Sequence, residues 1–397
     1  MTLAPRATAL ALSIALSIAM LSACNSSAPP PAASPAPPAA TAAPAPTAVK
    51  EEAREPDEQA EVDPLLSAAG LSYTTVNEAF LTPMTPDDNI DSPASWTAPD
   101  GSLWLIATAK GTHRLVLYRG DTGAAMRTVG EQGPGPGQFD RPNGVFVIDD
   151  LVLAVERDNR RVQVLRLPDM KPLGSFGSEQ LKQPYGLWLQ RVDGGFEVLV
   201  SDAYMDPSDE DAVPPLTELG QRFQRYRFIA SADAIEAQHL GSFGATDAAG
   251  AIRIPESLWG DATHGRLLIS EEDQADGTRI KVYGMDHAYT GKDLGADLFK
   301  AQAEGIALYA CANGSGWWIA TDQFKDRSLF HIFDRSSLEH RGSFAGNTVA
   351  NTDGVWLHQT ASERFPEGVF YAVHDDQGVA AFDWREVRSA LGLSGCE

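Results

Sequence analysis

A short tag of turn-forming residues recurs six times along this chain, and each copy opens an apolar run. The tags are Ser92-Pro93-Ala94-Ser95-Trp96, Pro142-Asn143-Gly144-Val145, Pro184-Tyr185-Gly186-Leu187-Trp188, Pro255-Glu256-Ser257-Leu258-Trp259, Ala303-Glu304-Gly305-Ile306 and Thr352-Asp353-Gly354-Val355-Trp356. Measured between their second residues, successive tags lie 50, 42, 71, 48 and 49 residues apart. Such a period, built of short strands, is typical of β-propeller blades. The spacing therefore predicts an all-β fold, a six-bladed β-propeller.

The pattern inside one repeat supports this prediction. Four short strand-like segments fill the second repeat, at residues 144–147, 151–155, 161–165 and 174–177. Helical periodicity is confined to residues 64–69 and 384–391, at the two ends of the folded part. The alternative is a generic all-β sandwich, which does not need a repeated tag at even spacing.

The first 24 residues have the pattern of a lipoprotein signal peptide. Arg6 precedes an apolar stretch over residues 9–20, and Leu21-Ser22-Ala23-Cys24 resembles a bacterial lipobox. Lipidation of Cys24 would anchor the chain to a membrane without spanning it. Since Asn25 is not the aspartate that retains such proteins at the inner membrane, we expect an outer-membrane lipoprotein of the cell envelope, facing the periplasm or the exterior. The alternative is an ordinary secretory signal in which Cys24 is incidental.

Composition separates the remainder into two parts. Residues 25–63 are rich in Ala and Pro and then acidic, so they predict a disordered linker with no core. Residues 64–397 form the expected propeller, which we predict to be a monomer. No other apolar run approaches the roughly 20 residues of a spanning helix, so membrane contact is expected through the lipid anchor only.

Two cysteines remain beyond Cys24. An exported protein meets an oxidising compartment, where Cys311 and Cys396 would form a disulfide that ties the C-terminal tail to the fifth repeat. Two separate thiols are the alternative.

The formal net charge is −23 at pH 7. Nucleic acid is a poor partner for such a surface, so we expect none. Many carboxylates suit hard cations such as Ca²⁺, and they also keep an exported protein soluble.

The tags define which side chains meet near the propeller axis. The innermost strand of each blade lines the channel, so six side chains would converge at one rim: Asp91, Asn143, Tyr185, Glu256, Glu304 and Asp353. Four of these are carboxylates, and a metal ion is the simplest neutraliser of such a group. The next strands would bring a second ring around it: Lys110, Glu156-Arg157 with Arg160 nearby, Ser201-Asp202, Glu271-Glu272-Asp273, Asp322-Gln323 and Asp375-Asp376. The alternative is that these acids cap blade turns.

These segments resemble the β-propeller phytases over most of residues 85–385. The resemblance lies in Asp91-Ser92-Pro93-Ala94-Ser95-Trp96, Tyr185-Gly186-Leu187-Trp188, Ser270-Glu271-Glu272-Asp273, Ala303-Glu304-Gly305-Ile306 and Asn351-Thr352-Asp353-Gly354. It implies a six-bladed propeller that uses Ca²⁺ to hydrolyse phosphomonoesters of inositol hexakisphosphate (phytate), as a 3-phytase does.

The resemblance also implies roles for individual residues. Lys110 and Arg157 would hold substrate phosphate, with Tyr185 donating to a phosphate oxygen. The implied calcium ligands are Glu256, Glu272, Glu304 and Asp353, with Asp91, Glu271 and Asp273 as further candidates. Lys110, Arg157, Tyr185 and Glu272 form the expected catalytic set, and Arg160, Asp322 and Gln323 are further substrate-facing residues.

Two departures from the family keep other functions open. The third repeat carries Ser201-Asp202-Ala203-Tyr204 where the family has a Lys-Glu pair, and an acidic, Pro-rich insertion follows over residues 206–219. The second repeat, with Asp158-Asn159-Arg160-Arg161, looks more like an NHL-type repeat, which favours a non-catalytic propeller that binds a partner or ligand in the envelope. A third alternative is a calcium-dependent lactonase-like hydrolase, with Glu304, Asn143 and Asp353 around one ion.

Overall fold

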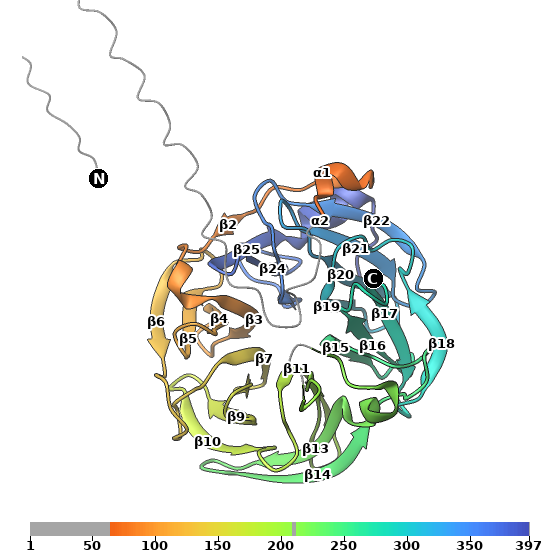
Figure 1. The fold of residues 1–397 in the computed structure, drawn as a ribbon. Coiled ribbons are helices and arrows are strands. Elements are labelled where there is room, and N and C mark those ends of the chain that lie inside the picture. The colour runs from red at the N-terminus through yellow and green to blue at the C-terminus, as the bar shows by residue number, and fades with distance from the viewer. Residues whose placement is uncertain (1–63, 209–211, 397) are drawn as a thin grey trace, which may run out of the picture. The chain divides into compact units, whose positions relative to one another are not determined.

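A computed structural model describes residues 64–208 and 212–396 of the chain. Its strands form six antiparallel sheets arranged in a ring (Figure 1). From the inner strand outward, the blades are β3 (Ile90–Thr97), β4 (Leu103–Ala109), β5 (Arg114–Arg119), β6 (Ala125–Val129); β7 (Pro142–Ile148), β8 (Leu151–Glu156), β9 (Arg161–Arg166), β10 (Lys171–Phe176); β11 (Pro184–Val192), β12 (Gly195–Asp202), β13 (Phe223–Ala230), β14 (Ile235–Phe243); β15 (Pro255–Asp261), β16 (Arg266–Glu271), β17 (Arg279–Gly284), β18 (Tyr289–Leu294); β19 (Ala303–Ala310), β20 (Gly316–Asp322), β21 (Leu329–Asp334), β22 (His340–Ala345); and β23 (Val355–His358), β24 (Val369–His374), β25 (Gly378–Asp383). The predicted six-bladed, all-β fold is confirmed.

The inner strands β3, β7, β11, β15, β19 and β23 neighbour one another in chain order, and β23 returns to β3. The predicted signal peptide, Cys24 and the linker lie outside the described residues, as do residues 209–211 of the insertion. Within the described part of the chain, no helix is both long and apolar enough to cross a bilayer.

The sixth blade is completed by the beginning of the folded part. Strand β2 (Phe80–Leu81) pairs antiparallel with β25, and β1 (Thr74–Thr75) pairs parallel with β22 of the fifth blade. The sequence analysis did not predict either strand, because two residues are too short to show an alternating pattern. The pairing of β2 with β25 closes the ring by joining the beginning of the folded part to the last strand.

The helices lie where the sequence predicts them, with two short 3₁₀ turns in addition. Helix α1 spans Leu66–Ala69 and α2 spans Trp384–Leu391, whereas η2 (Pro86–Asp88) and η3 (Leu216–Gln221) lie in connections between strands. Asp383 caps α2, because its side chain accepts from the backbone N–H of Arg385.

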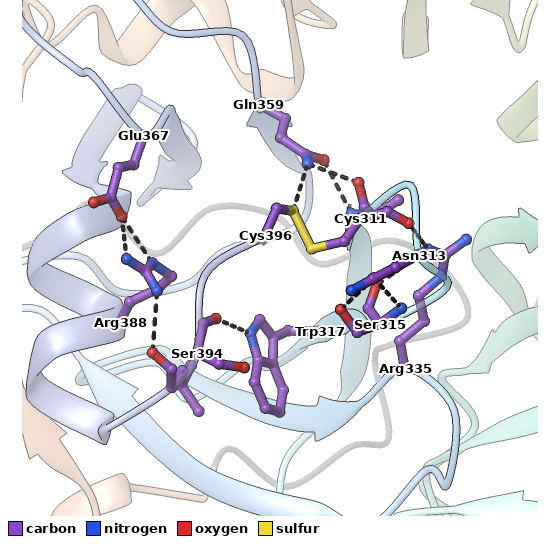
Figure 2. The surroundings of a disulfide bond; sticks show 12 residues. Cys311, Asn313, Ser315, Trp317, Arg335, Gln359, Glu367, Arg388, Ser394 and Cys396 are labelled. Atoms are coloured by element: carbon purple, nitrogen blue, oxygen red, sulfur yellow. Dashed lines mark hydrogen bonds and ion pairs between the residues drawn. A yellow bond between two sulfur atoms is a disulfide. The ribbon is translucent and has the colours of Figure 1, made fainter.

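A disulfide fixes the C-terminal tail. The sulfur atoms of Cys311, just after β19, and Cys396 lie 2.05 Å apart (Figure 2). Nearby, the indole N–H of Trp317 donates to the backbone carbonyl of Ser394 at 2.9 Å. The tail is therefore held against the end of the fifth blade that lies away from the tags.

Aromatic side chains fill the axis beyond the tags. Phe146, Trp259 and Trp356 come from three alternate inner strands, and their ring centroids lie 4.9–5.6 Å apart. Each stands three residues after a tag's second residue, about 10 Å further along its strand. The tag ends of the inner strands therefore form a rim above an aromatic layer; we call this rim the mouth.

Candidate functional site

A β-bulge at each tag places the residues of the mouth. In the first five blades the register between inner and second strands shifts at the tag, for example between Pro142 and Val145 and between Pro255 and Leu258. At each shift, the inner strand has two residues without a partner on the second strand. The first of these two residues in each blade is Asp91, Asn143, Tyr185, Glu256 or Glu304. Because a bulge turns a side chain out of the regular alternation, the repeated tag directs these side chains toward one place.

Lys110 lies at the centre of the polar contacts in the mouth. Its Nζ is 3.2 Å from Oδ1 of Asp91 and 3.7 Å from Oδ2 of Asp353, which joins the first and last blades. Burial alone would lower the pKa of Lys110, but the charges of Asp91, Asp353 and Asp376 outweigh it and raise that pKa well above its usual value. Lys110 is therefore a fixed positive charge.

Asp91 is buried and fully engaged. Besides Lys110, it accepts from the hydroxyl of Tyr185 at 3.2 Å and from that of Ser92 at 2.9 Å. The Tyr185 contact crosses from the third blade to the first. Burial, followed by the charges of Asp91, Glu256, Asp353 and Glu272, raises the pKa of Tyr185 well above its usual value, so its hydroxyl stays a proton donor.

The opposite side of the mouth is acidic. Glu256 is 7% exposed, and burial followed by the charges of Glu304, Glu272, Asp91 and Asp353 raises its pKa well above the usual value. These interactions show that five carboxylates from four blades converge: Asp91, Glu256, Glu272, Glu304 and Asp353.

Two glutamines orient members of this group. Gln302 donates its side-chain N–H to Oε1 of Glu272 at 2.9 Å, and Gln323 donates to Oδ1 of Asp353. Gln302 was not predicted. Its position, immediately before the fifth tag, is the signal that would have indicated it.

Other predicted residues serve the blade turns. Glu271 accepts from the backbone N–H groups of Arg253 and Ile254 at 2.7 and 2.9 Å, and Asp322 accepts from Lys300 and Ala301 at 3.0 and 2.8 Å. Glu156 and Asp202 bind the corresponding turns of the second and third blades in the same way. For these acids at the ends of second strands, the structure shows the turn-capping arrangement that the sequence analysis gave as the alternative.

The remaining predicted residues lie beside the mouth. Asp273 accepts from the backbone N–H of Ala275 at 2.9 Å and pairs with Arg253 at 3.8 Å. Arg157 and Arg160 are half-buried and exposed, on the turn after β8. The structure does not place Glu271, Asp273 or Asp322 among the five converging carboxylates.

The converging residues fit a hard cation. Glu256 interacts electrostatically with four other carboxylates, and Lys110 pairs with two of these, Asp91 and Asp353. Carboxylate oxygens are the ligands that Ca²⁺ prefers. The electrostatic repulsion that raises the pKa of Glu256 would be relieved by a divalent ion. Among residues 64–208 and 212–396, no three His, Cys, Asp or Glu side chains are close enough together to hold a metal as they stand.

Fold and site together define a six-bladed β-propeller with an acidic mouth at one end of its axis. Part of the chain also matches a known protein family. Residues 234–381 match the family model described as Phytase, so the resemblance to the β-propeller phytases is confirmed, and the match supports a phytase-like hydrolase in general terms. The matched segment contains Glu256, Glu272, Glu304 and Asp353, whereas Lys110 and Tyr185 precede it.

No curated protein matches the chain. Solved structures with similar folds include a nidogen/laminin complex (12% identity, 72% of this chain and 91% of that chain, TM-score 0.44) and BBS1N in complex with ARL6DN (10%, 78% and 97%, 0.45). Hydrazine synthase of Kuenenia stuttgartiensis is a third (9%, 83% and 83%, 0.40). These likenesses are too distant to carry an argument about function.

Proposed function

We propose that the protein is a calcium-dependent phosphomonoesterase that releases phosphate from phytate, in the manner of a 3-phytase. The observation that carries the proposal is the electrostatic interaction of Glu256 with Glu304, Glu272, Asp91 and Asp353, two of which, Asp91 and Asp353, also pair with Lys110. Four of these five acids lie in the segment that matches the phytase family.

The five carboxylates would hold the calcium ions. When bound, Ca²⁺ would polarise a phosphoryl group, lower the pKa of a water molecule and screen the anionic substrate from the acidic mouth. Gln302 and Gln323 keep the carboxylates of Glu272 and Asp353 oriented toward this place.

Lys110 and Tyr185 would bind the phosphate. Both are held against Asp91, so their N–H and O–H groups are positioned before substrate arrives. A charged donor and a neutral donor on one side of the phosphoryl group stabilise the negative charge that its oxygens carry. Arg157 and Arg160 are proposed to contact the more distant phosphates of a multiply charged substrate.

The test is phosphate release from phytate by the purified chain, with calcium and with excess chelator. We expect release with calcium only, and a Glu272→Gln variant that needs more calcium for half-maximal rate. Glu236→Gln, which neutralises an exposed glutamate on β14, is the matched control. No release in either condition, from a protein that calcium still protects against heat, would favour the ligand-binding propeller. Opening of a lactone instead would favour the third alternative.

We further propose that Cys24 carries the lipid and places the propeller at the outer membrane. A Cys24→Ser variant should move from the membrane fraction to the soluble fraction of the envelope while keeping its activity. Retention of this variant in the membrane fraction would contradict the proposed anchor.

A further inference from the structure

Asn143 stands at the mouth with both polar atoms of its side chain unpaired. It is 0% exposed, and neither Oδ1 nor Nδ2 has a hydrogen-bond partner among the described residues. Burying an amide without hydrogen bonds costs free energy, because its donor and acceptor lose their bonds to water. No hydrogen bond within residues 64–208 and 212–396 offsets this cost at Asn143.

The backbone fixes where this amide lies. Asn143 is released from ladder pairing by the bulge of β7, at the same position relative to the bulge as Asp91, Tyr185 and Glu256 in their strands. The next residue, Gly144, is pressed against the third blade: a Cβ there would meet the carbonyl oxygen of Tyr185 at 2.7 Å. Asn143 therefore belongs to the ring of mouth residues, and the backbone beside it is packed closely against the third blade.

The chemistry of an amide differs from that of its neighbours. Asp91, Glu256, Glu304 and Asp353 offer only acceptors when ionised, whereas Asn143 offers a neutral N–H donor as well as a carbonyl acceptor. A phosphate oxygen accepts from N–H groups and is repelled by carboxylates. In a ring of acids, a neutral donor is the group that contacts an anion without adding repulsion.

We infer that Asn143 is a phosphate-binding residue, whose Nδ2 donates to an oxygen of the anionic ligand while Oδ1 faces the cation held by the neighbouring carboxylates. The inference rests on the proposed function for the class of ligand, and it adds a substrate-binding residue that lies outside the segment matching the phytase family. The site takes a phosphate monoester or inorganic phosphate.

The test measures binding of inorganic phosphate to the purified full chain by calorimetry, at calcium concentrations too low to precipitate the salt. Asn143→Asp keeps the size and the acceptor but replaces the donor with a charge, so we expect phosphate affinity to fall at least about tenfold while calcium still binds. Asn143→Leu removes both polar atoms, so we expect the same loss of phosphate affinity. Asn313→Asp, in the hairpin turn between β19 and β20 away from the mouth, adds the same charge as a control and should bind phosphate as the unaltered chain does.

Thermal unfolding without calcium or phosphate separates binding from structural support. Leucine at position 143 leaves no unsatisfied polar group, so the melting temperature should stay the same or rise, whereas a structural asparagine would lower it. Phosphate affinity unchanged in both Asn143 variants, or no phosphate binding by the unaltered chain, would overturn the inference. If the chain hydrolyses phytate but binds phosphate equally well without Asn143, the proposed function stands and the role of Asn143 does not. If phosphate binding depends on Asn143 but phytate is not hydrolysed, the role of Asn143 stands and the proposed function does not.

Discussion

At the scale of single residues, the mouth brings several acidic side chains close together where they are buried, although like charges repel most strongly away from water. Glu256 illustrates this most clearly, since its burial, followed by the charges of four other carboxylates, raises its pKa well above the usual value. Lys110 pairs with two members of this group, Asp91 and Asp353. Stability and ligand binding are therefore in conflict at these residues, as is common at functional sites.

This conflict predicts how stability depends on pH. Because the pKa of Glu256 is higher in the folded protein than in the unfolded chain, the folded state binds more protons, and stability falls as pH rises above about 4.5. In chelator, we expect the melting temperature to decrease between pH 5 and pH 8, and Glu256→Gln to reduce that slope. Calcium should restore the melting temperature at pH 8 in the unaltered chain more than in Glu256→Gln. Equal slopes for Glu256→Gln and the exposed control Glu236→Gln would contradict this account.

Tyr185 offers a test of the proposed phosphate contacts. Tyr185→Phe removes the hydroxyl that bonds to Asp91 but keeps the ring, so the fold should be preserved. Under the proposed function, we expect kcat/KM for phytate to fall about 10- to 100-fold, because one hydrogen bond to a charged group is worth about 1.5–3 kcal/mol. Steady-state kinetics at saturating calcium measure this, with Tyr73→Phe, an exposed tyrosine, as the control. Unchanged kinetics would place the substrate away from Tyr185.

Residue types predicted the mouth better than they predicted individual roles. The tags identified Asp91, Glu256, Glu304 and Asp353 because their position in a repeat defines their position on the axis. Composition alone does not distinguish Glu271 from Glu272, which are adjacent and both buried. Glu271 binds the backbone of the turn before β15, whereas Glu272 accepts from Gln302 at the mouth. That difference is set by strand register, which the sequence does not show.

At the scale of elements, two features recur from blade to blade. In the first five blades a bulge releases one residue of the inner strand toward the mouth, and in the second to sixth blades the last residue of the second strand binds the turn that precedes the inner strand. In the sixth blade His374 takes the second role, because its Nδ1 accepts from the backbone N–H of Ala350 at 3.2 Å. The mouth residues are thus supported by a second set of polar side chains that do not enter it.

Removing one of these supports should destabilise the fold. Asp202 is fully buried and accepts from the backbone N–H groups of Lys182 and Gln183, so Asp202→Ala leaves two amides without their partner. We expect a loss of about 2–4 kcal/mol in the free energy of unfolding, measured with urea. Asp193→Ala, in the exposed β11–β12 turn, should change it by less than about 0.5 kcal/mol. A comparable loss in both variants would argue against a support role for Asp202.

Contact between tags leaves no room for side chains at certain glycines. A Cβ at Gly354 would lie 2.5 Å from the carbonyl oxygen of Asp91 and 2.6 Å from Cα of Ser92, both in the first blade. Gly354→Ala should therefore push the last blade from the first and cost about 1–3 kcal/mol. Gly220→Ala, where the nearest atom is an ordinary 3.6 Å contact, is the control for differential scanning calorimetry. Equal melting temperatures for the two variants would show that the blades can separate without cost.

At the scale of the whole molecule, the number and order of blades could be predicted from the sequence, whereas the way the ring closes could not. A tag marks the start of every inner strand in the sequence, because each inner strand is preceded by the same kind of turn. Closure depends on two residues, Phe80 and Leu81, which pair with Ala381 and Ala380 at the other end of the chain. Such a long-range pair leaves no local pattern to recognise.

The disulfide should stabilise the propeller without affecting the mouth. Cys311 and Cys396 are separated by 85 positions, and closing a loop of this length contributes about 2–5 kcal/mol, mainly by restricting the unfolded chain. We expect dithiothreitol to lower the melting temperature of the unaltered chain and to leave Cys396→Ser unaffected, with phosphate release at 25 °C similar in all samples. Loss of that release on reduction, while the protein remains folded, would contradict an independent disulfide and mouth.

The pairing of β2 with β25 makes the sixth blade depend on both ends of the folded part. Five blades draw their four inner-to-outer strands from consecutive residues, whereas the sixth needs the final strands, and β2 must stay available until these are present. A product that stops short of β25 keeps an unpaired strand and an open sheet edge, the kind of surface on which chains aggregate. Premature termination should therefore yield insoluble protein rather than a smaller working propeller.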